Sequence, residues 1–162
     1  MRKSIDIEYE VLDPKELPED EKKIYEAARE ATYGAYAPYS GFHVGSGVLL
    51  EDGNVITGSN CEHETYGLTA CAERVALWRA HAEGYGNDVR KLCLTGRRKD
   101  QKEGECTSIV DPCGACRAVI KEFEKRIQRK ITVLFSGWEG SVVRVEGIDN
   151  LFPLRRMKME GI

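Results

Sequence analysis

The sequence predicts a layered α/β domain built around a mixed β-sheet. Short apolar segments typical of strands alternate along the chain with segments of helical periodicity, and this alternation favours helices packed on a largely buried sheet. The composition, 41% hydrophobic and 31% charged, is that of an ordinary globular protein. The length of 162 residues suits one domain with a substantial core.

The first part of the chain is expected to contain an extension, a helix and a hairpin. Residues 1–18 form the extension, in which alternating apolar residues suggest a short strand at Ile5, Ile7 and Tyr9. A helix is predicted from Glu19 to Tyr33, because its apolar residues share one face and its acidic start suits the positive end of a helix. Strands are predicted at 44–50 and 54–57, with the turn signal Asp52-Gly53 between them.

The remaining elements continue the alternation. A helix is expected from Cys71 to Glu83, with an apolar stripe of Val75, Trp78 and Ala82. A strand at 89–95 and a polar loop at 96–111 follow. Pro112 suits the first turn of the next helix, where its missing N–H costs nothing. The apolar face of that helix holds Cys116, Val119, Ile120, Phe123 and Ile127, and strands are predicted at 131–135 and 142–145.

Bulk properties exclude several classes of protein. A net charge of −3 and a pI near 5.7 provide no positive field for a nucleic-acid backbone, so a polymer of that kind is not the expected partner. The charged N-terminus lacks the apolar region of a signal peptide, and no apolar run approaches the roughly 20 residues that span a bilayer. We therefore expect a cytoplasmic protein that does not enter membranes. In that setting the six cysteines favour metal binding or reactive thiols over a disulfide framework.

Three of the cysteines have a spacing that suits one metal ion. Cys113 and Cys116 are three residues apart, which places both thiols on one face of a helix. Cys71 and Glu73 are two residues apart, so both can face one metal only if Cys71 lies at the start of its helix. Two helix N-termini would then point at the metal and favour thiolates. Arg74 and Arg117 follow these segments and could offset the negative charge.

This set of residues favours a catalytic zinc site, although spacing alone leaves structural and redox sites open. Three thiolates leave one position of a four-coordinate zinc for water, and Glu73 could accept the proton of that water and return it to a leaving group. A fourth thiol from Cys61, Cys93 or Cys106 would instead close the site and make it structural. The pair in Pro112-Cys113-Gly114-Ala115-Cys116 also fits a redox site.

Several separate motifs together resemble the small zinc-dependent cytidine deaminases. They are Tyr39-Ser40-x-Phe42-x-Val44-Gly45, Asn60-x-Glu62, Tyr66-Gly67-Leu68-Thr69-x-Cys71-Ala72-Glu73-Arg74 and Pro112-Cys113-Gly114-Ala115-Cys116-Arg117. The resemblance covers about residues 20–153. It implies a three-layer α/β/α sandwich with a five-stranded mixed sheet. We therefore expect a catalytic domain at 19–154, and its composition makes the tail at 155–162 basic. It also implies a homotetramer.

The same resemblance implies a reaction and a role for each matching residue. The reaction is hydrolytic deamination of cytidine or deoxycytidine to the uridine product and ammonia. Cys71, Cys113 and Cys116 would bind one Zn²⁺ per chain, and Glu73 would move the protons. The substrate-binding and charge-neutralising roles would fall to Phe42, Asn60, Glu62, Ala72 and Arg74.

Two departures from the family pattern leave the substrate open. His63-Glu64 stands where the family has Asn-Ala, and Arg156 stands where it has a phenylalanine that stacks on the base. These changes motivate a rival substrate, a modified cytosine nucleoside such as the antibiotic blasticidin S. Two further hypotheses are a polynucleotide-editing enzyme and a non-enzymatic zinc module. Editing would need an open basic channel, and the acidic pI argues against one.

Overall fold

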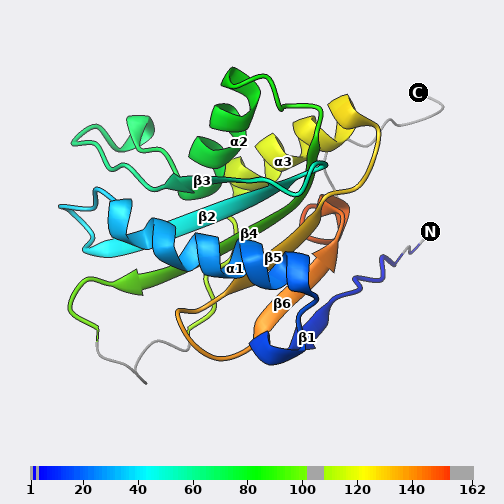
Figure 1. Cartoon of the computed structure of the whole chain (residues 1–162), viewed down its shortest axis with the longest axis horizontal. Helices are drawn as coiled ribbons and strands as arrows, with labels where there is room; N and C mark the ends of the chain where they lie inside the picture. Colours follow the sequence, from blue (N-terminus) through cyan, green and yellow to red (C-terminus); the bar gives the residue numbers. More distant parts are fainter. Residues whose placement is uncertain (1, 3, 102–107, 154–162) are drawn as a thin grey trace.

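A computed structural model describes residues 2, 4–101 and 108–153. Its sheet has the strand order β1-β6-β5-β4-β2-β3 (Figure 1). The strands are β1 (Glu10–Leu12), β2 (Phe42–Leu50), β3 (Val55–Ser59), β4 (Val89–Arg98), β5 (Thr132–Ser136) and β6 (Val142–Glu146). The helices are α1 (Glu19–Ala31), α2 (Ala72–Ala82) and α3 (Gly114–Ile127). The sheet is mixed, because β4 and β5 are parallel and the other neighbours are antiparallel.

The predicted three-layer α/β/α architecture is confirmed. Helix α1 covers one face of the sheet, and α2 and α3 cover the other (Figure 1). Successive residues of the central strands alternate between the two cores: Leu92 and Leu94 pack on the side of α2 and α3, whereas Cys93 packs against α1. Buried strands covered on both faces explain why these segments read as continuous apolar runs.

The sheet has six strands instead of the predicted five, and the additional one comes from the N-terminal segment. Strand β1 pairs with β6 in antiparallel register, with Val11 opposite Val143. The alternating apolar residues Ile5 and Ile7, which suggested a strand, are about half exposed and lie outside β1. The pairing of residues 10–12 with β6 is a tertiary contact that local alternation could not locate.

The topology brings the starts of α2 and α3 to the same edge of the sheet. Strands β3 and β4 both pair antiparallel with β2, so they run in the same direction and end at the same edge. Helix α2 follows β3 and helix α3 follows β4. Strand β2 starts at this edge, where Phe42 lies opposite Arg98. Segments that are distant in sequence therefore meet where crevices form in α/β folds, at the carboxyl ends of parallel strands.

The buried face of α2 differs from the predicted apolar stripe. Trp78 is 47% exposed, and the face turned toward the sheet carries Ala72, Glu73, Ala76, Leu77 and Ala80. Small residues are required there because the helix backbone lies directly over Gly58 of β3. A Cβ atom at Gly58 would lie 2.4 Å from Ala76 N and 2.5 Å from Ala72 O.

The Gly58→Ala variant is therefore expected to be less stable by about 1–3 kcal/mol, because the added methyl group must displace the backbone of α2. The midpoint of urea unfolding measures this loss. Gly67→Ala is the matched control, since a Cβ atom at Gly67 meets nothing within 4 Å. Equal midpoints for both variants would contradict the close approach of α2 to β3.

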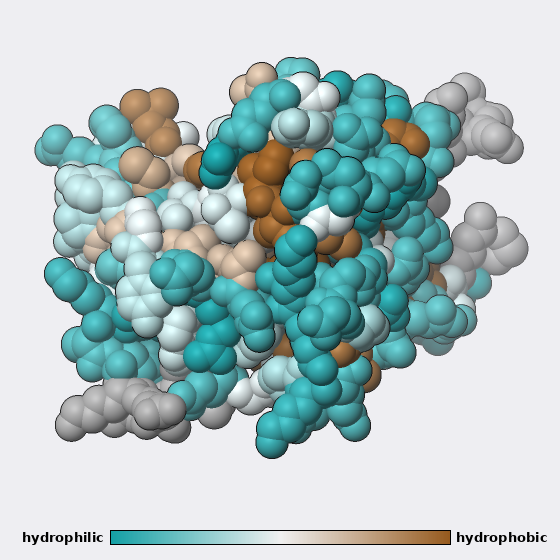
Figure 2. Space-filling model, viewed as in Figure 1, coloured by the Kyte–Doolittle hydropathy of each residue, from teal (hydrophilic) through white to brown (hydrophobic). Residues whose placement is uncertain are grey.

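The surface seen in Figure 2 is mainly hydrophilic, with apolar side chains showing over the β2–β3 hairpin between α1 and α2. Within the described residues, no helix has the length and apolar character needed to cross a bilayer.

Candidate active site

Three thiols meet at the shared edge of the sheet. The sulfur atoms of Cys71, Cys113 and Cys116 all lie within 4.8 Å of one another. The distance between the sulfurs of Cys71 and Cys113 is 3.8 Å, and that between Cys113 and Cys116 is 3.5 Å. The three-residue spacing therefore brings the thiols of Cys113 and Cys116 together, as expected, and the fold adds the thiol of Cys71.

Both helices begin at this cluster. Cys71 is the N-cap residue of α2 and Cys113 is the N-cap residue of α3, and both have extended backbone angles. An N-cap residue in this conformation directs its side chain differently from a helical residue. Cys71 and Glu73 can therefore face the same point although they are only two residues apart. The positive ends of two helices thus lie beside the thiols and favour their ionised form.

The protonation of the thiols reflects this environment. The pKa of Cys71 is lowered to about 5, first by hydrogen bonding from Cys116 and then by the nearby Arg74 guanidinium. The pKa of Cys116 is raised, because it keeps its proton to donate to Cys71 and because it is buried. The environment of Cys71 therefore favours its thiolate form, which is the form that binds a metal ion.

The donor set fits zinc. Thiolate sulfur is a ligand that zinc prefers, and three of them around one point leave a fourth tetrahedral position. In the described part of the chain, no other Cys, His, Asp or Glu belongs to the group. Cys93, considered above as a fourth ligand, is fully buried in the core on the α1 side, and Cys61 lies outside the group. Cys106 lies outside the described residues.

The two arginines that follow the ligand segments have different partners. Arg74 donates to Cys71 Sγ at 3.6 Å and to the carbonyl oxygen of Thr69 at 2.8 Å, so its charge lies at the cluster as expected. Arg117 has other hydrogen-bond partners. Its guanidinium donates to the carbonyl oxygens of Pro112 and Leu151, each at 2.7 Å, and to Asp111. Arg117 therefore ties the turn before Cys113 to the C-terminal end of the described chain.

Glu73 lies in the first turn of α2 and is only 3% exposed. Burial raises the pKa of its carboxyl group to about 7, and the neighbouring Cys71 thiolate adds to the rise. Hydrogen bonds from its own backbone N–H and from Cys116 act in the opposite direction. A carboxyl group of this kind can both accept and release a proton near neutral pH.

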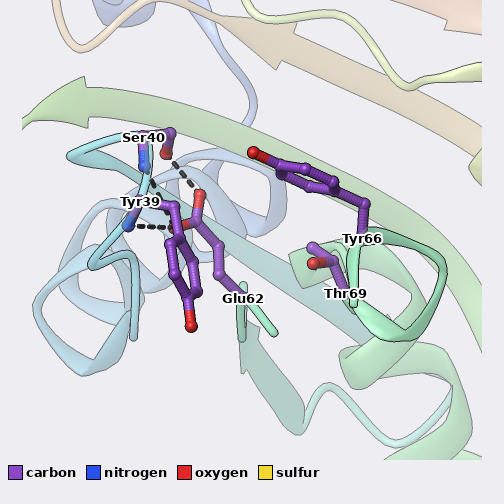
Figure 3. A pocket seen from close by; sticks show the side chains of 5 residues that line it. All are labelled: Tyr39, Ser40, Glu62, Tyr66 and Thr69. Atoms are coloured by element: carbon purple, nitrogen blue, oxygen red, sulfur yellow. Dashed lines mark hydrogen bonds between the residues drawn. The ribbon is translucent and has the colours of Figure 1, made fainter. Parts of the chain in front are cut away.

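A second part of the site lies between the start of β2 and the segment that follows β3. A cavity of about 300 Å³ is lined by Tyr39, Ser40, Glu62, Tyr66 and Thr69 (Figure 3). Glu62 points toward the loop of Tyr39 and Ser40, and Tyr66 and Thr69 lie across from it. Hydroxyl groups, aromatic rings and one carboxylate are suited to a ligand that carries hydroxyl groups. Thr69 connects this cavity to the thiols, because Arg74 binds its carbonyl oxygen.

The remaining predicted residues frame this region. The Asn60 side chain accepts from Val44 N at 2.8 Å and donates to the carbonyl oxygen of Phe42 at 3.0 Å, so it joins β2 to the end of β3. The ring of Phe42 lies against Gly96, where a Cβ atom would come within 2.9 Å of it. Ala72 is fully buried at the start of α2.

The loop that departs from the family pattern is exposed. His63 Nδ1 accepts a hydrogen bond from Thr65 N at 2.9 Å, and His63 does not belong to the thiol group. Tyr66 is 82% exposed and lines the cavity, so it is not a core aromatic. Arg156 lies outside the described residues. Sequence reasoning assigned no role to Tyr39, Ser40 or Thr69, although all three stand within the motifs that carry the resemblance.

Comparisons with known proteins agree with this geometry. Residues 18–133 match the family model described as "Cytidine and deoxycytidylate deaminase zinc-binding region". A cytidine deaminase from Halalkalibacterium halodurans is 44% identical over 103 residues, which cover 64% of this chain and 71% of that protein. A crystal structure of cytidine deaminase from Burkholderia pseudomallei superimposes with a TM-score of 0.68 and 34% identity, covering 80% of this chain and 94% of that one.

A blasticidin-S deaminase from Bacillus cereus is a more distant relative. It is 26% identical over 81 residues, which cover 50% of this chain and 57% of that protein. The thiol group at two helix N-termini, the buried carboxyl group beside it and the match over most of the chain lead to one conclusion. This chain belongs to the zinc-binding cytidine and deoxycytidylate deaminase family.

Proposed function

We propose that this chain catalyses the hydrolytic deamination of cytidine and deoxycytidine to uridine and deoxyuridine, with release of ammonia. The observation that carries the proposal is the buried Glu73 in the first turn of the helix whose N-cap residue, Cys71, belongs to the thiol group. A structural zinc site needs no buried acid beside its ligands. A hydrolytic site needs one, because a proton must leave water and reach the departing amine.

Cys71, Cys113 and Cys116 hold one zinc ion in this proposal, and the bound ion supplies a Lewis acid that activates water for attack. Glu73 accepts a proton from the attacking water at a carboxylate oxygen. It delivers a proton to the pyrimidine ring nitrogen as the water oxygen bonds to the amino-bearing carbon. It then carries the second proton to the amino group, so that the carbon–nitrogen bond breaks and ammonia leaves. Arg74 reduces the negative charge of the thiolates from its position beside Cys71.

The sugar and the base are bound by groups at the same sheet edge. Glu62 accepts hydrogen bonds from the ribose hydroxyls in the cavity beside Ser40. Asn60 has a donor hydrogen left after its bond to Phe42 and holds the two strands together around the nucleoside. Phe42 lines the pocket, and Ala72 contributes to substrate binding from the start of α2.

The proposal extends to a cytoplasmic homotetramer with a catalytic domain at residues 19–154. Tyr36, Tyr39, Tyr66 and Leu68 are all more than half exposed, and two of these tyrosines line the cavity. Such an apolar rim supports contact with neighbouring subunits at the site. Light scattering of the purified protein measures the oligomeric state, and a monomer would contradict this part of the proposal.

A turnover assay tests the function directly. We expect release of ammonia from cytidine and deoxycytidine, with one zinc ion per chain by metal analysis. A single-stranded oligonucleotide that contains cytosine is expected to be deaminated at least about 100-fold more slowly, because the cavity beside Glu62 is small. Comparable rates on the oligonucleotide would favour polynucleotide editing instead.

A modified cytosine nucleoside such as blasticidin S is the second candidate substrate. His63 and Glu64, the residues that depart from the family pattern, are exposed beside the cavity and motivate this candidate. We expect kcat/KM to be higher for cytidine than for blasticidin S, in agreement with the greater identity to cytidine deaminases. The reverse order would assign the chain to antibiotic deamination.

A further inference from the structure

The carboxylate of Glu62 is held by donors from a single loop. Its Oε2 atom accepts from the backbone N–H groups of Tyr39, at 2.9 Å, and Ser40, at 3.1 Å. Its Oε1 atom accepts a hydrogen bond from the Ser40 hydroxyl (Figure 3). Two of these three donors belong to Ser40. The pKa of Glu62 is lowered, first by the Ser40 hydroxyl and then by the two backbone groups, so the carboxylate stays ionised and can only accept.

The loop itself is fixed by its own backbone. Gly41 has a positive φ of 66°, and its N–H donates to the carbonyl oxygen of Ala37 at 3.0 Å. This turn directs the N–H groups of Tyr39 and Ser40 toward Glu62. Strand β2 begins directly after it, at Phe42.

The Ser40 hydroxyl joins the two halves of the nucleoside pocket. Its hydrogen is committed to Glu62, and its oxygen accepts the N–H of Phe42 at 3.0 Å. Both neighbours therefore fix the direction of the hydroxyl. On one side of the hydroxyl lies the Glu62 carboxylate, which is proposed to bind the sugar. On the other side lies Phe42, which is proposed to line the nucleoside pocket.

We propose that Ser40 is a positioning residue for sugar recognition: its hydroxyl holds the Glu62 carboxylate in the orientation that accepts hydrogen bonds from the nucleoside sugar. This inference rests on the proposed function. Ser40 donates its hydrogen to Glu62 and not to the substrate, so it acts through Glu62. The side of the carboxylate that faces the cavity is left free for the sugar hydroxyls.

The test compares two substrates that differ only in those hydroxyls. Ser40→Ala is expected to lower kcat/KM for cytidine about ten-fold, mainly through KM, because a charge-assisted hydrogen bond that orients a ligand-binding group is lost. For 2′,3′-dideoxycytidine, which lacks the 2′- and 3′-hydroxyls that Glu62 would accept from, we expect a change of less than about two-fold. Ser40→Thr keeps the hydroxyl and is expected to restore the wild-type preference. Ser40→Cys keeps the volume with a weaker donor and is expected to fall between the two.

A double-mutant cycle separates this role from a general effect on the loop. In a Glu62→Ala background, Ser40→Ala is expected to have almost no further effect on cytidine turnover, because the partner through which it acts is gone. Ser46→Ala is the matched control. It removes a hydroxyl bonded at 2.8 Å to the Cys93 carbonyl in the core, and it should lower the melting temperature without changing the preference between the substrates.

Two results would overturn the inference. One is an equal loss of kcat/KM on both substrates in Ser40→Ala, and the other is the full ten-fold loss persisting in the Glu62→Ala background. Either would leave the proposed deaminase function intact. Failure of the wild-type protein to deaminate any cytosine nucleoside would instead overturn the proposed function, and the role of Ser40 with it.

Discussion

The Glu73→Gln variant is expected to deaminate cytidine about 1,000-fold more slowly than the wild type while still binding one zinc ion per chain. Glutamine has nearly the same shape but cannot accept and return a proton, and general acid–base catalysis contributes factors of about 10² to 10⁴. The side chain does not belong to the thiol group, so the ligands remain in place. Steady-state kinetics gives kcat, and metal analysis gives the zinc content.

Glu83→Gln is the matched control for this variant. Glu83 is the C-cap residue of the same helix, where its carboxylate pairs with Arg79 on the exposed surface. The same chemical change there is expected to leave kcat within about two-fold of the wild type, because an exposed pair of this kind contributes little. Full activity of Glu73→Gln would refute the proposed mechanism. Loss of zinc from Glu73→Gln would show that this carboxyl group holds the site together and does not move protons.

The Cys113→Ala variant is expected to lose both zinc and activity. Cys113 is the exposed member of the thiol group and forms no part of either core, so its replacement removes a ligand with little loss of packing. Two thiols hold zinc far more weakly than three, and without the ion there is no Lewis acid to activate water. Metal analysis and a turnover assay on the purified variant test both effects.

Chelation of zinc from the wild-type protein should reproduce the loss of activity, and added zinc should restore it. It should also lower the melting temperature, because an ion that binds only the folded chain stabilises it. Cys113→Ala is expected to melt at the same temperature with and without a chelator. Cys61→Ala is the matched control, since that exposed thiol lies outside the group and its removal should leave one zinc per chain. Full zinc content in Cys113→Ala would mean that another residue completes the site.

The helices and central strands were predictable because their patterns are local. Helix α3 has the expected inner face, with Cys116, Ile120 and Phe123 buried, since a periodicity of 3.6 residues determines which side chains share a face. If Cys71 and Glu73 are to face one metal, their two-residue spacing requires Cys71 to lie at the start of its helix, and Cys71 is the N-cap residue of α2.

The structure differed from the sequence-based predictions where the placement of a side chain depends on a residue that is distant in sequence. The buried face of α2 is the one that carries its alanines, because Gly58 of β3 has no side chain and allows the backbones of α2 and β3 to approach closely. Arg117 follows Cys116 and could offset the charge of the thiolates, but only the tertiary structure shows that its guanidinium binds the carbonyl oxygens of Pro112 and Leu151. Gly58 and Leu151 are both distant in sequence from the residues that they contact.

The sequence by itself determined the chemistry of this protein. Residue type and local spacing indicate a metal site with an acid beside it, because they decide which ligands and acids are available. The resemblance of the surrounding motifs to a known family indicates that the site belongs to a zinc-dependent deaminase. The tertiary structure decided how those groups meet. Parallel strands β3 and β4 end at one sheet edge, so two helix N-termini converge on the thiols. The same edge places Ser40 against Glu62, a contact across 22 residues of chain that no local pattern specifies.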